Sequence, residues 1–173
     1  YHKDVVFATL IPAEEWLYDW YARCGYTQHI TCTPPPADVD SMDFDTFDRW
    51  QRSKPCIVLH DKEGFDIVKE DFRIAQAIDP DAKRQQNDIP SMIRIINAEM
   101  ALTLYAGCHP EKEENIRVYN DSDIPMNNIY FCIKKGKVTR TNYPLPDTRS
   151  LTIQELADYI FADDTLLMTL MLN

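Results

Sequence analysis

Glycine, basic residues and long hydrophobic runs are all scarce in this chain of 173 residues. The four glycines lie far apart, at Gly25, Gly64, Gly107 and Gly136. A glycine-rich loop that cradles phosphate groups with its backbone N–H groups is therefore not encoded. No apolar run approaches the length of a membrane-spanning helix, and we expect no secretory signal peptide.

The scarcity of basic residues gives the chain an acidic character. Lys and Arg number 18 against 28 Asp and Glu, so the formal net charge is -10. This balance argues against binding nucleic acid through a broad basic surface and against binding anionic membranes. We expect a cytoplasmic protein that attracts cationic partners, such as an amine substrate. The apolar fraction of 45% is sufficient for a hydrophobic core in one ordinary domain or two small ones.

Cysteine and histidine show no pattern typical of a metal site. The five cysteines are odd in number and never form a C-x-x-C pair: Cys24, Cys32, Cys56, Cys108 and Cys132. This spacing argues against a disulfide framework and against zinc, and favours buried thiols in a reducing compartment. An acidic cluster between Asp38 and Asp48 lacks the glycine and the closing glutamate of a calcium loop. We therefore expect no metal.

The stretch most typical of a functional site lies near the start. Val5–Ile11 is an apolar run of strand length that Pro12 ends. A helix is predicted from Glu14, with Gly25 as its C-terminal cap, because glycine takes the left-handed conformation without steric cost. Tyr26–Thr33 then predicts a second strand.

The remaining chain predicts a mixture of helices and strands. Three consecutive prolines at 34–36 form a stiff connector, and the polar stretch Asp79–Ile89 is the best candidate for a boundary or loop. The predicted elements are a helix capped by Asp43, a strand over Cys56–His60, a helix over Glu63–Ala77, a strand over Met92–Ile96, a helix from Asn97 to Gly107, a strand over Ile116–Asn120, a hairpin of Ile129–Ile133 with Lys137–Thr141 around Gly136, and a last helix within Ser150–Phe161. The fold class is α/β with mixed sheets (α+β). Trp16, Trp20 and Trp50 are expected to anchor a core or a domain interface rather than form a ligand cage.

The predicted strand, helix and strand resemble the second half of the GCN5-related N-acetyltransferase fold. The resemblance depends on Ile11-Pro12-Ala13 at the end of the strand and on the Tyr-x-x-x-Gly-Tyr pattern from Tyr21 to Tyr26. In that family the first tyrosine of the pattern commonly protonates the departing thiolate of coenzyme A, which implies this role for Tyr21. The alternative is that Tyr21 is an aromatic residue of an amphipathic helix with its hydroxyl at the surface.

A second resemblance covers the region from about Met92 to Phe161. It looks like the sterol-carrier-protein-like domain of acetyltransferases of the enhanced-intracellular-survival type. Three ordered motifs carry the similarity: Met92-Ile93-Arg94-Ile95-Ile96-Asn97, Asp123-Ile124-Pro125-Met126-Asn127-Asn128 and Leu151-Thr152-Ile153-Gln154-Glu155-Leu156. The expected organisation is the C-terminal half of an acetyltransferase domain at 1–33, a remnant of a second such domain and a linker at 34–89, and the carrier-like domain with its tail at 90–173.

These resemblances imply an N-acetyltransferase that moves an acetyl group from acetyl-CoA, its co-substrate, to an amine on a small molecule or peptide. In the enhanced-intracellular-survival type the C-terminal carboxylate reaches the catalytic site and helps to deprotonate the amine, which implies this role for Asn173. The apolar tail from Leu166 to Leu172 suits burial in a cleft. Alternatively, the tail packs on its own domain or frays, as termini commonly do.

The chain also departs from the family pattern. The family binds the pyrophosphate of coenzyme A with an Arg/Gln-x-x-Gly-x-Gly/Ala turn, and nothing here matches it. The strands that should precede Val5 are absent. We therefore expect part of an acetyltransferase that does not hold acetyl-CoA as it stands, and we assign no cofactor-binding residues. The alternative function is a non-catalytic ligand-binding or oligomerisation module, and a homo-oligomer is a possible assembly.

Overall fold

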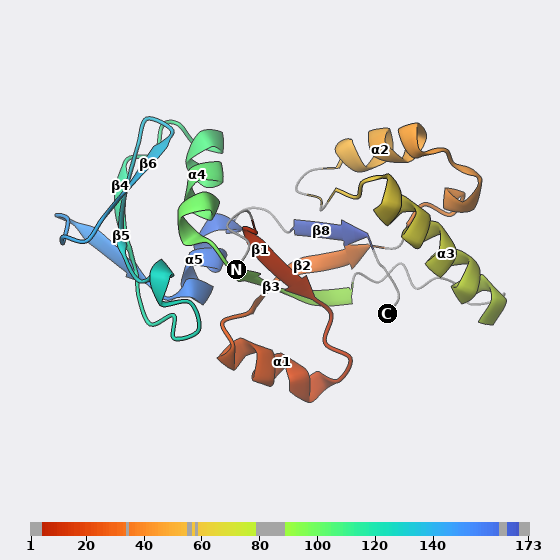
Figure 1. Cartoon of the computed structure of the whole chain (residues 1–173), viewed down its shortest axis with the longest axis horizontal. Helices are drawn as coiled ribbons and strands as arrows, with labels where there is room; N and C mark the ends of the chain where they lie inside the picture. Colours follow the sequence, from red (N-terminus) through yellow and green to blue (C-terminus); the bar gives the residue numbers. More distant parts are fainter. Residues whose placement is uncertain are drawn as a thin grey trace. The chain divides into compact units, whose positions relative to one another are not determined.

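The computed structural model describes residues 5–33, 35–54, 57, 59–78, 89–162 and 166–169 (Figure 1). Within these residues the chain forms five α-helices and two four-stranded sheets, so the predicted mixed α/β class is confirmed. The elements are β1 (Phe7–Leu10), α1 (Glu15–Arg23), β2 (Thr27–Thr33), η1 (Val39–Ser41), α2 (Phe44–Arg52), α3 (Lys62–Ile78), β3 (Ile89–Ile95), α4 (Ala98–Cys108), β4 (Glu114–Val118), η2 (Pro125–Asn127), β5 (Tyr130–Lys134), β6 (Lys137–Thr141), β7 (Thr148–Leu151), α5 (Ile153–Ile160) and β8 (Leu166–Thr169).

The chain divides into two compact units. The first unit comprises Tyr1–His29 and Met92–Ala162, and the second comprises Ile30–Ser91 and Asp163–Asn173. One sheet has the strand order β1-β3-β2-β8. In it β1 pairs antiparallel with β3, with Phe7 opposite Ile95, and β2 pairs parallel with β8.

The other sheet belongs to the first unit and has the order β6-β5-β4-β7. Its strands pair antiparallel except for β4 and β7, which are parallel. The predicted hairpin is confirmed: β5 and β6 are joined at Lys135 (φ 53) and Gly136 (φ 71). Two successive positive φ angles are what a tight two-residue hairpin turn requires, and glycine adopts one of them without strain.

An apolar core formed by described residues holds the first unit together. α4 lies along one face of the second sheet (Figure 1), and α5 contacts β7 and α4. The core residues come from β3, α4, β4, β5, β7 and α5: Ile95, Ala98, Ala101, Leu102, Ala106, Ile116, Val118, Phe131, Ile133, Leu151, Ile153, Leu156 and Ala157. Their burial follows from the apolar periodicity of these segments, since alternate residues of β4 and β5 point to the same face.

The second unit has a small aromatic core between α2, α3 and η1. Phe47 is fully buried, and its ring stacks on that of Phe65 with 4.7 Å between ring centroids. Val39, Val68 and Phe72 complete the cluster. Asp43 caps α2 by accepting a hydrogen bond from the backbone N–H of Thr46 at 2.8 Å, as predicted.

Caps also define the helices of the first unit. Asn97 caps α4 through the N–H of Met100, as predicted, but the helix continues through Gly107 to Cys108. α5 begins with a capping box, in which Thr152 and Glu155 each bond the backbone of the other. The strand-like run from Leu151 to Ile153 therefore ends at Leu151, because Thr152 caps the helix.

Several predictions fall wholly or partly outside the described residues: part of the strand over Cys56–His60, the polar stretch 79–88, and the tail apart from β8. The described residues of that predicted strand, Ile57, Leu59 and His60, form no strand, so this prediction is wrong there. Among the described cysteines, Cys108 is exposed, so the expectation of buried thiols is wrong there, and Cys24 and Cys132 are only half-buried. None of the helices in the described part of the chain is long and apolar enough to cross a membrane.

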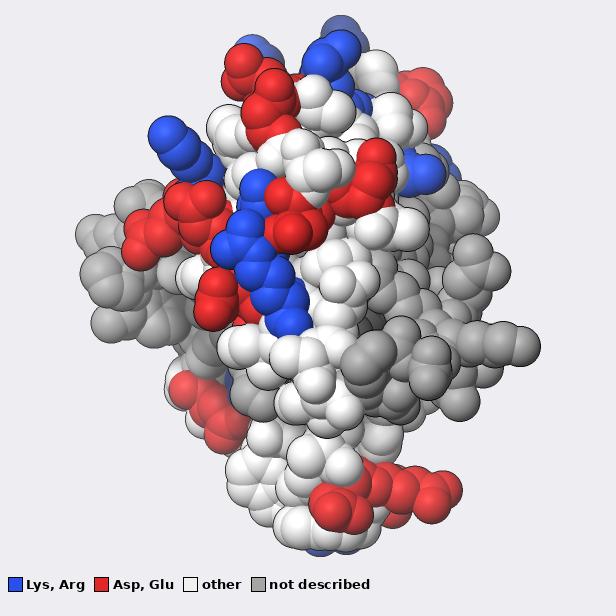
Figure 2. Space-filling view, turned by 90° about the vertical axis from the view of Figure 1, so that its right-hand side faces the viewer, with Lys and Arg blue, Asp and Glu red and all other residues white. Residues whose placement is uncertain are grey.

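Charged side chains of both signs lie next to one another on the face shown in Figure 2. Two ion pairs in the second unit show this mixing: Arg52 pairs with Asp48 at 2.7 Å, and Arg73 pairs with Asp40. Exposed pairs of this kind contribute little to stability, typically below about 1 kcal/mol each.

Candidate functional site

Tyr21 lies on α1, the helix predicted to carry it. The helix contains no buried residue, and Tyr21 itself is half-buried. Its ring meets Trp20 edge-on, with 4.9 Å between centroids, and Tyr26 at 5.6 Å. These edge-to-face contacts are favourable aromatic geometries, so Tyr26 supports one side of the Tyr21 ring.

The turn after α1 requires glycine. Gly25 has φ +83, which confirms the predicted left-handed cap. A Cβ atom at this position would lie 3.0 Å from Ile153 Cγ2 and 3.4 Å from Arg94 Cζ. Glycine therefore serves two purposes here: it permits the backbone conformation and it lets the Arg94 side chain approach the turn.

Arg94, on β3, binds the carbonyl end of α1. Its side chain is almost fully buried, and its Nη1 donates a hydrogen bond to the Cys24 carbonyl oxygen. The same guanidinium forms two ion pairs, with Asp121 at 2.8 Å and with Asp123 at 2.7 Å. Two carboxylates thus compensate the buried charge and fix the plane of the guanidinium fork.

Asp121 connects Arg94 to the start of α4. Its carboxylate is 1% exposed and accepts hydrogen bonds from Asn127 Nδ2 at 2.9 Å and from the Ile124 N–H at 3.0 Å. Asn127 Oδ1 in turn accepts a bond from the backbone N–H of Ala98 at 3.0 Å. Arg94 Nε is buried without a hydrogen-bond partner, but the other polar groups named here are paired, and the low local dielectric makes each lost bond costly.

Gln154, in the first turn of α5, makes a second contact with the end of α1. Its Nε2 donates to the carbonyl oxygens of Ala22 at 2.6 Å and Tyr26 at 3.3 Å. These carbonyls belong to the last turn of a helix and the segment after it, where intrahelical donors run out. A further bond from Thr27 Oγ1 to Asp158 at 2.9 Å joins the following strand to α5.

The Tyr26 hydroxyl has a perturbed acidity. Burial raises the pKa of Tyr26 above its ordinary value, and the nearby positive charge of Arg94 opposes this rise only in part. Tyr26 therefore stays neutral at physiological pH, with its ring beside Tyr21.

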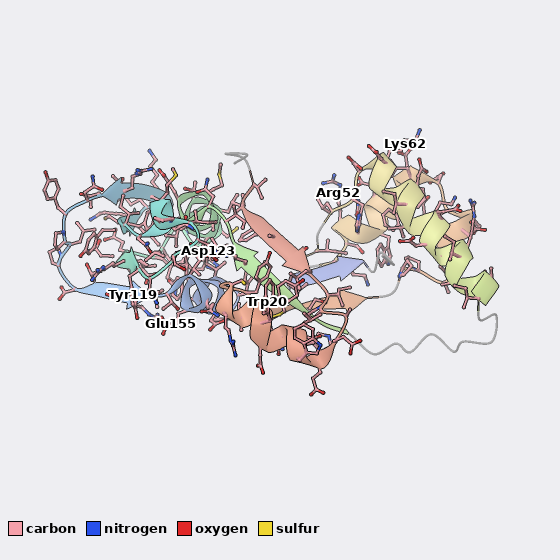
Figure 3. The ribbon with its side chains drawn as sticks, turned by 60° about the horizontal axis from the view of Figure 1, so that its bottom comes forward. Trp20, Arg52, Lys62, Tyr119, Asp123 and Glu155 are labelled. Carbon is pink, nitrogen blue, oxygen red and sulfur yellow. The ribbon has the colours of Figure 1, made fainter. Side chains whose placement is uncertain are left out.

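The N-terminal half of α1 presents acidic and aromatic groups to solvent. Glu14, Glu15, Trp16 and Asp19 line a shallow hollow. Trp16 is 65% exposed and Trp20, labelled in Figure 3, is 50% exposed, so the expectation of core anchors is wrong for both. Carboxylates at this helix start repel the pyrophosphate of coenzyme A, and none of the described segments has the glycine-rich turn that such a group needs. The described residues therefore do not fit that part of acetyl-CoA.

A second concave region of the first unit is a pocket of about 460 Å³ near the start of α4. It is lined by Asn97, Glu99, Met126, Asn127, Ile129, Phe131 and Arg140. Glu99 and Arg140 form an ion pair at 3.2 Å, while Ile129 and Phe131 contribute apolar surface. The volume suits a small molecule with an apolar body.

Only one of the two predicted catalytic residues lies in the described part of the chain. Tyr21 is described and half-buried as set out above, whereas Asn173 lies outside the described residues. Sequence reasoning missed the roles of Arg94, Asp121 and Gln154, although all three lie within or beside the motifs that carried the second resemblance. A signal was present at Arg94, a charged residue within the apolar run Met92–Ile96. In the described part of the chain, no group of His, Cys, Asp and Glu side chains could hold a metal ion.

Comparison with known proteins gives a limited result. No family model matches the chain, and no curated protein matches it. Among solved structures, the chain is similar to a GCN5-related N-acetyltransferase from Anabaena variabilis ATCC 29413, with 14% sequence identity and a TM-score of 0.48. The match covers 96% of this chain and 73% of that one.

Proposed function

We propose that this chain is a module of a coenzyme A-dependent N-acetyltransferase that acts on an amine. The observation that carries the proposal is the placement of Tyr21. This residue lies half-buried on a helix between two strands of one sheet, four residues before the left-handed Gly25. The arrangement agrees with the strand, helix and strand that the sequence resemblance implies.

In the proposed reaction the amine nitrogen forms a bond to the acetyl carbon while the bond from that carbon to sulfur breaks. The departing thiolate takes a proton from the Tyr21 hydroxyl, and the amine gives up its own proton to a base. We propose the α-carboxylate of Asn173 as this base. No step is assigned to binding of the pyrophosphate, because the described residues do not fit it.

The finer classification is also a proposal. The second sheet with α4 and α5 is the region that we assign to a sterol-carrier-protein-like domain of the enhanced-intracellular-survival type. The three motifs of that resemblance lie at β3, at η2 and at the start of α5. The three-part division at 1–33, 34–89 and 90–173 remains a prediction.

Replacing Tyr21 with phenylalanine tests the proposed role, because it removes the hydroxyl and keeps the ring contacts with Trp20 and Tyr26. Acetyl transfer from acetyl-CoA to a panel of amines is measured by release of free thiol, in the full-length parent of which this chain is proposed to be a module. We expect kcat to fall by at least about 100-fold, the usual contribution of a general acid. Tyr143→Phe is the matched control, because Tyr143 is 77% exposed on a loop. An unchanged kcat for Tyr21→Phe would remove this role.

The pocket near α4 favours a second candidate, a non-catalytic module that binds a small ligand. Titration calorimetry with acetyl-CoA separates the two functions. Binding of acetyl-CoA to this chain alone with micromolar affinity would contradict the second candidate. Phe131→Leu would test the pocket less clearly, because Phe131 lines the pocket and also belongs to the core. A loss of binding in that variant could therefore come from a loss of stability.

A further inference from the structure

We propose that Arg94 and Gln154 are positioning residues that hold the Tyr21 ring in place by binding the carbonyl end of α1. This inference rests on the proposed function and names part of the same site. Both residues act on Tyr21 through the backbone, because their side chains bind carbonyl oxygens at the end of its helix.

The helix itself cannot fix the position of Tyr21. α1 has nine residues, which is shorter than the length at which isolated helices persist in water, and none of its residues is buried. Burial of an apolar face, the usual source of helix placement, is therefore weak here. Hydrogen bonds at the end of the helix must therefore fix its position, because burial of its residues does not.

Three carbonyl acceptors at that end, at alternate residues, accept hydrogen bonds from two side chains. Arg94 binds Cys24, and Gln154 binds Ala22 and Tyr26. A cation is favourable at this position, because the helix dipole places partial negative charge on the last carbonyls. The Asp121 and Asp123 carboxylates hold the guanidinium on its far side, so Arg94 cannot follow α1 if the helix shifts.

The constraint reaches Tyr21 over a short path. The Tyr26 N–H donates to the Tyr21 carbonyl oxygen at 3.2 Å, and the Cys24 N–H donates to the same oxygen at 2.9 Å. The Tyr26 ring also packs edge-on against the Tyr21 ring. Holding the carbonyls of Cys24 and Tyr26 in place therefore fixes the backbone at Tyr21. It also fixes the Tyr26 ring, which packs against the Tyr21 ring.

Gln154→Leu is the primary test, because leucine preserves most of the side-chain volume and removes both hydrogen bonds. Amide hydrogen exchange is measured across the whole chain. We expect exchange in α1 and the turn at 24–26 to accelerate by about tenfold, the effect of losing roughly one net hydrogen bond, with β4 and β5 unchanged. Arg140→Gln is the matched control, because it breaks an ion pair of the same unit at the pocket near α4. Unchanged exchange in α1, or equal acceleration throughout the first unit, would overturn the proposal.

Kinetics separate positioning from a general loss of structure. We expect Gln154→Leu to lower kcat by about tenfold and to leave the KM for the amine unchanged. In a double-mutant cycle, Tyr21→Phe with Gln154→Leu should be no slower than Tyr21→Phe alone, since Gln154 acts only through the Tyr21 hydroxyl. Additive losses would contradict the proposal.

Arg94→Lys gives an independent check. Lysine keeps the positive charge but cannot span the two carboxylates and the Cys24 carbonyl with one planar fork. The same acceleration of exchange in α1 is expected, and normal exchange would count against Arg94. If Tyr21→Phe leaves acetyl transfer unchanged, the proposed role of Tyr21 fails, and the exchange data still decide whether these residues hold α1.

Discussion

α1 and the pair α2 and α3 are helices held in place by opposite means. The two helices of the second unit enclose an aromatic core, in which Phe47 is fully buried and stacks on Phe65. By contrast, α1 buries none of its residues, and its end is bound by two polar side chains, Arg94 and Gln154.

The difference predicts how each region responds to mutation. A helix placed by burial is sensitive to side-chain volume and tolerant of small angular shifts, because dispersion contacts are not directional. A helix placed by hydrogen bonds at its end is sensitive to donor geometry. The first arrangement suits a scaffold, and the second suits a side chain that must point in one direction.

The largest expected effect is in the aromatic core. Phe47→Ala should lower the stability of the second unit by about 4 kcal/mol, because it removes a fully buried ring and leaves a cavity. Chemical denaturation measures the change, and hydrogen exchange should show it in α2 and α3. Phe47→Leu is the volume-preserving control. Normal protection of both helices in Phe47→Ala would show that burial does not hold this pair.

Asp121→Ala tests the polar side of the comparison. The substitution leaves Arg94 buried with the partly exposed Asp123 carboxylate and the Cys24 carbonyl as partners, and we expect a loss of about 3 kcal/mol in the unfolding free energy. Asp123→Ala is the matched control, because its carboxylate is 53% exposed and its removal should cost less. Equal losses from the two variants would show that burial of Asp121 has no special importance.

Gly25→Ala should cost about 1–2 kcal/mol, because alanine is strained at φ +83 and its Cβ would press on Ile153. Gly107→Ala is the contrasting variant. That glycine lies inside α4, and a Cβ there meets nothing within 4 Å, so alanine should stabilise the helix by about 0.5–1 kcal/mol. Thermal unfolding of the two variants should therefore shift in opposite directions.

Acidification should weaken the second unit, because His60 is buried there. This residue is 8% exposed, and burial lowers its pKa below the ordinary value. The unfolded chain then binds a proton that the folded unit excludes, so stability falls as pH drops below about 6.5. Denaturation at about pH 7.5 and about pH 5.5 measures the fall. In His60→Asn this difference should shrink, and an unchanged difference would assign the pH effect to other groups.

The smallest effect is expected at the ion pair of Glu99 and Arg140. Both side chains are about half-exposed, and Arg140→Gln should change the unfolding free energy by less than about 1 kcal/mol. A larger change would mean that the pocket near α4 contributes more to stability than its exposure suggests. The polar contacts at α1 would then not be the main polar contribution to the stability of this unit.

Local features of the fold could be predicted from the sequence because they depend on neighbouring residues. Asp43 and Asn97 act as caps through N–H groups three residues away. Gly25 and Gly136 mark turns with positive φ angles. Each of these features needs only short-range geometry, which residue type and spacing determine.

The binding of α1 could not be predicted in this way. Arg94 and Cys24 are 70 residues apart, and Gln154 and Ala22 are 132 residues apart. No periodicity in a single sequence specifies such pairs. For Trp16 the error is the reverse: its apolar side chain predicted burial, but the residue is exposed on α1. Tyr21 was identified as a candidate from its motif, and its chemical role stays a prediction.

The hydrogen bonds between the end of α1 and α5 limit which segments of the chain can fold when they are separated. A synthetic peptide of residues 5–33 contains every residue of α1 but none of the donors that bind its last carbonyls, so it should be largely unstructured in water. The α1 helix therefore depends on contacts with α5, which lies far away in the sequence. Cleavage between the two segments, or transfer of α1 to another protein, should unfold α1.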